Sequence, residues 1–126
     1  MLAKNLEVFK KSHKFTLQIY EITKAFPREE LFGLVSQMRR AAYSINSNIV
    51  EGVAKKSSNE YARFILIARG SASELEYQLE LAKDLKYITE LEFGELLDKI
   101  NQIGKMLSAL HKSIKAQPLS PIPEPL

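Results

Sequence analysis

Apolar and polar residues alternate with a helical period along most of this chain, most clearly around residues 37–52, QMRRAAYSINSNIVEG. Apolar residues recur at spacings of three and four, which places them on one helix face: Val35, Met38, Ala42, Ile45 and Ile49. A polar stripe runs beside them: Arg40, Ser44, Asn48 and Glu51. The apolar face predicts burial in a core. The polar face predicts an interface or a binding site, because polar groups that another helix covers need hydrogen-bonding partners.

Few residues interrupt the body of the chain, since Pro27 is the only proline before residue 118. The segment before Pro27 predicts a helix over residues 5–25 with two apolar faces. One face holds Leu6, Phe9, His13, Leu17 and Tyr20, and the other holds Phe15, Ile19, Ile22 and Phe26. A second helix is predicted from Pro27 to about residue 54, with Glu29 and Glu30 suited to its positive N-terminal end.

Two capping-box patterns mark the starts of the remaining helices. Ser57 with Glu60 predicts the start of the third helix, and Thr89 with Glu92 that of the fourth. Each is followed by an apolar stripe: Tyr61, Ile65, Ala68, Ala72, Leu75, Leu79 and Ala82, then Leu96, Ile100, Ile103, Leu107, Leu110 and Ile114. These patterns predict an all-α fold, an up-down-up-down antiparallel four-helix bundle over residues 1–116. Residues 117–126 form a proline-rich C-terminal tail.

Small residues gather near the middles of the second and third helices: Ala41, Ala42, Ala68, Gly70, Ser71, Ala72 and Ser73. They predict that these two helix axes approach closely. Gly70 is the sharpest case, because a glycine in a helix interior costs about 1 kcal/mol relative to alanine. Close packing at Gly70 is the expected compensation.

Residues 37–52, together with RFILIARGSASELEYQLELA at residues 63–82, resemble the signature of the 23S rRNA-intervening-sequence protein family, small bacterial four-helix-bundle proteins. The resemblance covers residues 27–88 and rests on positions in both blocks: Gln37, Arg39, Arg40, Ser44, Asn48, Glu51, Gly52, Arg69, Gly70, Ser71, Glu74 and Leu75. Many relatives carry Pro where this chain has Asn46, and a Gly-Arg pair where it has Ala54 and Lys55. The resemblance implies a four-helix bundle assembled into a ring-shaped homo-oligomer, a homopentamer.

Composition fits a soluble globular protein, with 45% hydrophobic and 26% charged residues. No apolar run approaches the roughly 18 residues of a membrane-spanning helix, and the N-terminus lacks the apolar stretch of a secretory signal. A cytoplasmic protein without membrane attachment is expected. The lack of cysteine rules out disulfides and is consistent with a reducing compartment.

Catalytic and metal-binding patterns are missing from the sequence. The histidines, His13 and His111, lack a glutamate three residues earlier, so the E-x-x-H pairs of a di-iron bundle do not occur. The phosphate-loop, dinucleotide and nucleophile-elbow motifs are absent. His13 lies in an apolar stripe and is predicted to be partly buried with its polar atoms satisfied. We therefore expect no enzyme activity, no cofactor and no metal.

Charged and polar residues cluster near the helix middles: Arg39, Arg40, Asn48, Glu51, Arg69 and Glu74. Opposite charges on adjacent helices suit bidentate ion pairs. In the structural interpretation, these residues hold the second and third helices together, or one subunit to the next, with Arg69 and Glu74 among the pairs. In the functional interpretation, the arginines point into a lumen and hold phosphates.

The net charge of +3 is unevenly placed. An up-down-up-down bundle brings the start of the first helix, the second connection and the end of the fourth helix to one end. That end collects ten cations against Glu7, Glu51 and Glu60: Lys4, Lys10, Lys11, Lys14, Lys55, Lys56, Arg63, Lys105, Lys112 and Lys115. The opposite end is acidic, with Glu21, Glu29, Glu30, Glu80, Asp84, Glu90, Glu92, Glu95 and Asp98 among five cations.

A basic face of this kind binds phosphate backbones with salt-dependent and largely sequence-independent affinity. The sequence predicts a non-enzymatic oligomeric bundle that binds nucleic acid, RNA first, through Lys10, Lys11, Lys14, Lys55, Lys56, Arg63, Lys112 and Lys115. Nearby Tyr61 and Phe64 suit base stacking or the core. The alternative is an assembly or scaffold protein that binds another protein through the acidic end or through the tail, whose PLSP spacing suits a PxxP-reading domain.

Overall fold

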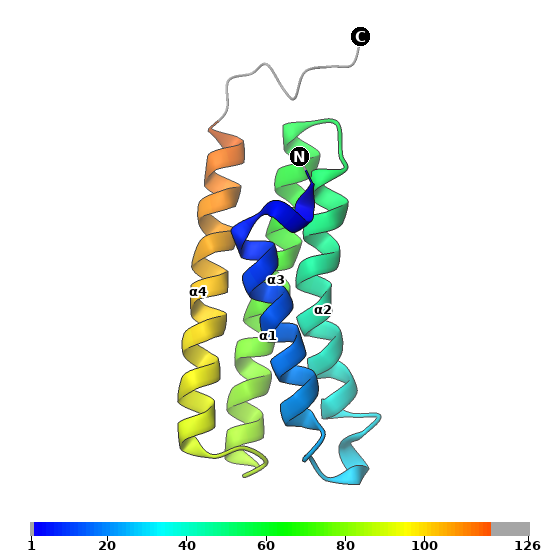
Figure 1. Ribbon diagram of the computed structural model, residues 1–126, viewed down its shortest axis with the longest axis vertical. Helices are drawn as coiled ribbons and strands as arrows, with labels where there is room; N and C mark the ends of the chain where they lie inside the picture. The colour runs from blue at the N-terminus through cyan, green and yellow to red at the C-terminus, as the bar shows by residue number, and fades with distance from the viewer. Residues whose placement is uncertain (1, 117–126) are drawn as a thin grey trace.

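The computed structural model describes residues 2–116, which form four α-helices and two short 3-10 helices (Figure 1). Helix α1 spans Glu7–Thr23, α2 Leu34–Val53, α3 Ser58–Asp84 and α4 Glu90–Lys115. The 3-10 helices are η1, Ala3–Asn5, and η2, Arg28–Glu30. Successive α-helices run in opposite directions, so the predicted four-helix bundle is confirmed. The predicted proline-rich tail with its PxxP spacing lies outside the described residues.

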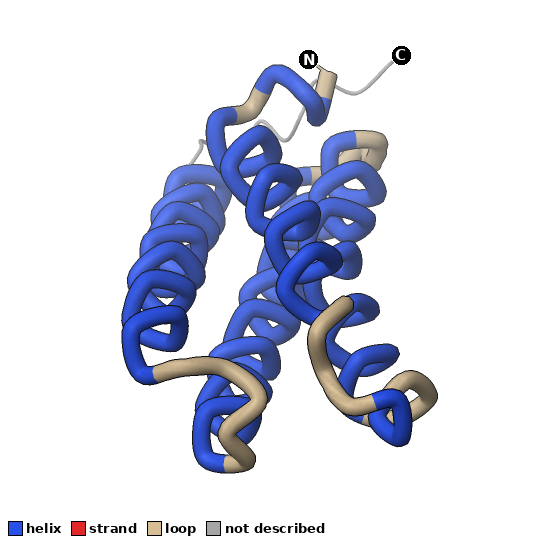
Figure 2. Tube along the Cα trace, turned by 60° about the horizontal axis from the view of Figure 1, so that its bottom comes forward, coloured by secondary structure: helices blue, strands red, loops and turns tan. Residues whose placement is uncertain are grey.

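Helix α1 packs against α2 and α4 and lies diagonally across from α3 (Figures 1 and 2). It is also the shortest of the four, with 17 residues against 27 in α3. At 1.5 Å per residue the difference amounts to roughly 15 Å of helix length. The most extensive packing is that of α3 against α2 and α4. Helix α3 is therefore the central support of the bundle, and α1 is the least embedded helix.

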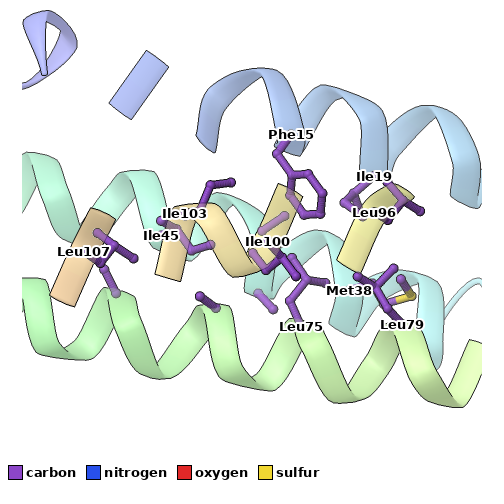
Figure 3. Close-up of a cluster of buried hydrophobic side chains, with 14 of the residues drawn as sticks. Phe15, Ile19, Met38, Ile45, Leu75, Leu79, Leu96, Ile100, Ile103 and Leu107 are labelled. Atoms are coloured by element: carbon purple, nitrogen blue, oxygen red, sulfur yellow. The ribbon is translucent and has the colours of Figure 1, made fainter. Parts of the chain in front are cut away.

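The core consists of the apolar stripes that the sequence predicted for α2, α3 and α4. All five predicted α2 residues are buried, as are most of the α3 and α4 stripe residues. Figure 3 shows side chains from all four helices meeting in one cluster, including Phe15, Ile45, Leu75 and Ile100. Burying a side chain of this size contributes about 1.5–3 kcal/mol. The apolar stripes thus supply the main stabilisation of the bundle.

The prediction for the first helix was right for one face and wrong for the other. Phe15, Ile19 and Phe26 are buried, but Leu17 is 56% exposed and Tyr20 is exposed as well. The inner face of α1 instead includes buried polar residues, Ser12, Thr16 and Thr23. Thr16 and Thr23 can be buried there because their hydroxyls donate to backbone carbonyls of α1, and the Ser12 hydroxyl donates to a side chain of α2. A pattern that counts only apolar residues therefore wrongly predicted that the face with Leu17 and Tyr20 is buried.

Buried hydroxyls also join α1 to α2. Thr16 Oγ1 donates to the carbonyl of Ala42 at 3.2 Å, and Ser12 Oγ donates to Asn46 Oδ1 at 2.6 Å. The amide of Asn46 in turn donates to the carbonyl of Phe9 at 3.0 Å. Helix α2 is unbroken at Asn46. A proline at this position has no side-chain amide and would form neither contact of Asn46.

The second helix begins later than predicted. The chain after Pro27 forms η2, and α2 starts only at Leu34. The carboxylate of Glu30 accepts from the Leu34 backbone N–H at 3.1 Å and from the Tyr87 hydroxyl at 2.8 Å. Glu30 therefore satisfies a free N–H at the start of α2 and ties the first connection to the third.

The two capping boxes predicted for α3 and α4 are found, the second in full. The Ser57 hydroxyl accepts from the Glu60 backbone N–H at 3.1 Å. Thr89 and Glu92 accept each other's backbone N–H groups, at 3.0 and 2.8 Å. Local sequence therefore fixed both helix starts.

Glycines explain part of the close packing, but not at the predicted place. A Cβ on Gly52 would lie 3.1 Å from side-chain atoms of Tyr61 and Phe64, so this glycine lets α3 approach α2. A Cβ on Gly104 would lie 3.1 Å from the Arg69 guanidinium. Gly70 is exposed and has open space around it, so the predicted close packing at Gly70 is wrong.

The contact between Glu30 and Tyr87 predicts a pH-dependent stability. The Tyr87 hydrogen bond, followed by that from Leu34, lowers the pKa of Glu30 below its ordinary 4.5, and the same bond raises the pKa of Tyr87 above 10.0. A lowered carboxyl pKa stabilises the fold above the ordinary value, and the gain is lost as pH falls through the folded-state value. Tyr87→Phe should therefore be less stable than wild type at neutral pH. The difference should shrink below about pH 4.5.

Urea unfolding followed by circular dichroism at about pH 7 and about pH 3 measures this difference. A difference in unfolding free energy between wild type and Tyr87→Phe that stays constant from about pH 7 to about pH 3 would show that the Glu30–Tyr87 contact does not contribute to the pH dependence of stability. Above pH 10.0, the raised pKa of Tyr87 predicts a second loss of the wild-type advantage.

Gly94→Ala should stabilise the protein by about 1 kcal/mol, because Gly94 is an exposed residue of α4 with open space where the Cβ would lie. Gly52→Ala is the matched control and should gain less or lose stability, because its Cβ would lie 3.3 Å from the Tyr61 carbonyl oxygen. Thermal unfolding at one protein concentration compares them. Equal changes in melting temperature for the two variants would contradict the difference in packing between Gly94 and Gly52.

Candidate nucleic-acid interface

Three separate segments bring basic residues to one end of the bundle, as the topology predicted. The α2–α3 connection and the end of α4 lie at the top of Figure 1, and α1 begins below them in the upper part of the bundle. We call the basic end the eight residues predicted for phosphate contact: Lys10, Lys11, Lys14, Lys55, Lys56, Arg63, Lys112 and Lys115. Seven of them are exposed, and Lys55 is half-buried. The bundle thus gathers cations from distant parts of the sequence.

At the α2–α3 corner, an aromatic ring supports two of these cations. The Lys55 ammonium lies 5.1 Å and the Arg63 guanidinium 4.5 Å from the centre of the Phe64 ring. Both distances are within the range of a cation–π interaction. Tyr61 is half-buried against the core, and burial raises its pKa. Phe64 therefore positions charge at this corner, and Tyr61 belongs to the core.

The cations of the basic end differ in what compensates their charge. Lys10 pairs with Glu7 at 3.2 Å, and Arg63 donates twice to Glu60 at 3.2 Å. The Arg63 hydrogen bond lowers the pKa of Glu60.

Lys11 and Lys115 donate instead to the amide oxygens of Gln102 and Asn59, both at 3.0 Å. An amide is neutral, so these contacts orient a lysine without cancelling its charge. Such lysines remain available to a phosphate.

A groove of about 710 Å³ lies between α1 and α4 and reaches into the basic end. Lysines from both helices line it, among them Lys11, Lys14 and Lys99, and apolar residues such as Phe15 and Met106 lie between them. The sequence did not predict this groove or a role for Lys99. It arises from the spacing of α1 and α4, which residue patterns alone do not specify.

Arg39 contacts α1, contrary to the predicted pairing with α3. Its guanidinium donates to Thr23 Oγ1 at 2.9 Å and to the carbonyl of Tyr20 at 3.2 Å. It also lies 4.7 Å from the centre of the Tyr20 ring. Arg39 therefore links α2 to α1 through oxygen acceptors and an aromatic ring.

Arg69 also has different partners from those predicted. It donates to Ser73 Oγ at 2.7 Å within α3 and to Ser108 Oγ of α4 at 3.3 Å. Gly104 leaves room for this side chain beside α4. Over residues 2–116 the ion pairs all join residues at most three apart in sequence. The expected pair of Arg69 with Glu74 is therefore not formed within the chain.

Hydroxyl groups connect α2 to α3 where ion pairs were predicted. Ser44 Oγ and Ser71 Oγ are 2.9 Å apart, and the Asn48 amide donates to the Ser44 carbonyl at 2.8 Å. Exposed Arg40 and Glu74 line a small polar cavity of about 60 Å³ beside these serines. Glu51 is exposed, without an ion pair in the described part of the chain. Within the polar stripe of α2, Ser44 therefore contacts α3, Asn48 bonds to Ser44 within α2, and Arg40 and Glu51 lie at the surface.

Residues 2–116 also bear on the expectations for His13, for a metal site and for a membrane-spanning helix. His13 is exposed and stacks on Phe9 with ring centres 6.4 Å apart, so its predicted partial burial is wrong. In this range, histidines and carboxylates form no cluster of three or more that suits a metal ion. None of the helices found there combines the length and apolarity needed to cross a membrane.

Comparisons with known proteins agree with this architecture. The crystal structure of a protein of unknown function from the S23 ribosomal protein family of Bacteroides thetaiotaomicron superposes with a TM-score of 0.78 and is 29% identical. The match covers 88% of this chain and 99% of that chain. No curated protein matches. The family model described as 23S rRNA-intervening sequence protein matches residues 4–109, most of the chain. The chain therefore belongs to the 23S rRNA-intervening sequence protein family.

Proposed function

We propose that this protein is a non-enzymatic nucleic-acid-binding bundle whose basic end contacts phosphates. The observation that supports the proposal is that the three chain segments carrying these eight cations, the start of α1, the α2–α3 connection and the end of α4, lie toward one end of the bundle. Lysines exposed on a rigid helical scaffold attract a phosphate backbone, and the counterions they release favour binding. Lys11 and Lys115 support this role directly, because their amide partners leave their charge intact.

RNA is the first candidate among nucleic acids. The family model is named for an intervening sequence of 23S rRNA, and the structural neighbour is assigned to a ribosomal protein family. Neither name states what this chain binds. The chemistry of the basic end favours backbone contact over base reading, because seven of its eight cations are lysines and Arg63 is paired with Glu60.

Self-association is the second part of the proposal, and exposed apolar side chains support it. Helix α3 exposes Leu66, Ile67 and Tyr77, the last at 63%. On another side of the bundle, α1 and α2 expose Leu17, Tyr20, Tyr43 and Val50. A closed ring requires two different, complementary surfaces on each copy. Apolar side chains exposed on α3 and, separately, on α1 and α2 suit this geometry, including the homopentamer that the family resemblance implies.

A scaffold protein that binds a protein partner is the competing function. The acidic end of the bundle exposes apolar residues on both of its connections and the start of α4, with Phe32 at 91% and Leu31, Leu85 and Leu91 also exposed. Apolar groups surrounded by carboxylates suit a basic, partly apolar protein surface. If the protein does not bind nucleic acid, the scaffold function replaces the nucleic-acid proposal.

Charge reversal tests the basic end. Changing Lys10, Lys11, Lys55 and Lys56 to Glu should abolish most binding to generic RNA. The variant loses phosphate contacts, and its new carboxylates repel the RNA phosphates. For wild type, the logarithm of the affinity should fall linearly with the logarithm of the salt concentration, and the variant should lose most of that slope. Fluorescence anisotropy over a salt series measures both quantities.

The matched control changes Glu90, Glu92 and Glu95 to Lys at the acidic end. It should bind as well as wild type or better. Glu92 belongs to the capping box of α4, so loss of this cap is expected to lower the stability of the control by about 1 kcal/mol. Wild-type protein that binds no RNA at about 50 mM salt, or two variants that both bind like wild type, would sink the nucleic-acid proposal.

Light scattering tests self-association. Wild type should have several times the mass of the 14.3 kDa chain at micromolar concentration. Tyr77→Lys should reduce that mass, because it places a charge in the proposed apolar contact of α3. Phe32→Lys at the acidic end is the control and should leave the mass unchanged. A monomeric wild type would refute the assembly.

A further inference from the structure

The groove between α1 and α4 joins an apolar floor to a basic rim. Phe15 and Ile103 are buried at its base, and Met106 and Phe9 are half-buried along it. Phe9 stacks on His13, which also lines the groove, with the two rings 9° from parallel. Its volume of about 710 Å³ falls within the range of pockets that hold small organic ligands. The groove therefore offers contact to a flat, largely apolar group.

The rim selects for an anion. Five lysines line the groove against two carboxylates, which leaves +3: Lys4, Lys10, Lys11, Lys14 and Lys99 against Glu7 and Asp98. Two of these lysines bridge the helices, Lys11 to Gln102 at 3.0 Å and Lys99 to Gln18 at 3.1 Å. Both acceptors are neutral amides on an exposed surface. An incoming phosphate can replace such an amide as the lysine's partner and gains the full ammonium charge.

We infer that this groove binds the unpaired bases of single-stranded RNA, while its lysines hold the phosphates on either side; the inference rests on the proposed function. A duplex stacks its bases inside the helix, so it presents only phosphates to the lysines. A single strand can turn its bases onto apolar and aromatic side chains, which is how many single-strand binders gain affinity without reading sequence. The groove thus makes the basic end selective for single strands.

The test compares single- and double-stranded RNA on the full chain. A fluorescein-labelled RNA of about 12 nucleotides without self-complementarity has a suitable length. Anisotropy titrations use this strand alone and annealed to its complement. Wild type should bind the single strand about tenfold more tightly than the duplex, a difference expected from stacking of one or more bases.

Two groove variants separate base contact from phosphate contact. Phe9→Leu removes a ring and Met106→Gln makes the floor polar, and neither changes the charge. Each should weaken single-strand binding about tenfold, with duplex affinity and the salt slope unchanged. Phe93→Leu is the matched control, because Phe93 is also half-buried on α4 and lies under a lysine, Lys83 at 4.5 Å. It should bind like wild type. Melting curves of all variants report any loss of folding.

The outcomes distinguish the inference from the proposed function. If wild type binds single strand and duplex equally, or if the groove variants bind like wild type, the groove inference falls while the basic end stands. Poly-glutamate and unlabelled RNA of equal charge serve as competitors. If poly-glutamate displaces the labelled RNA equally well, the groove recognises negative charge alone and would bind an acidic protein in the same way. The inference then also falls. Wild-type protein that binds neither RNA removes both proposals.

Discussion

Each of the four helices carries one apolar stripe that has to be buried against the others, and the rest of the structure depends on this burial. The connections are short, so each helix packs antiparallel to the one before it. Helix α3, with its buried small residues Ala68 and Ala72, supports both α2 and α4. The position of every charged side chain at the ends follows from this arrangement. A basic end therefore exists as a consequence of core packing.

Polar contacts then determine how the helices sit against one another. Ser44 and Ser71 join α2 to α3, Arg69 reaches from α3 to Ser108 of α4, and Asn46 joins α2 to α1. These are bonds to hydroxyls, amides and carbonyls, and not ion pairs. A neutral acceptor is cheaper to desolvate than a carboxylate, so an interhelical seam can be partly buried at lower cost. Within residues 2–116, specific packing is thus achieved without ion pairs between helices.

Helix α1 is joined more loosely to α4 than to α2. Between α1 and α2 the contacts are buried hydroxyls and the Asn46 amide, whereas the side-chain bonds from α1 to α4 within residues 2–116 come from exposed lysines. The space left between α1 and α4 is the groove. The loose packing of α1 against α4 therefore leaves a concave surface that reaches into the basic end.

The sequence by itself determined the helices, their order and the end at which the cations gather. Apolar periodicity identified the core of α2, α3 and α4, and the capping boxes placed the starts of α3 and α4, because both signals act over a few neighbouring residues. Only the tertiary structure decided which face of α1 is buried, since Ser12 and Thr16 become compatible with the core once Asn46 and the Ala42 carbonyl are close. The partners of Arg39 and Arg69 and the α1–α4 groove were likewise set by distances between helices. Such distances depend on how all the side chains pack together, which no local pattern records.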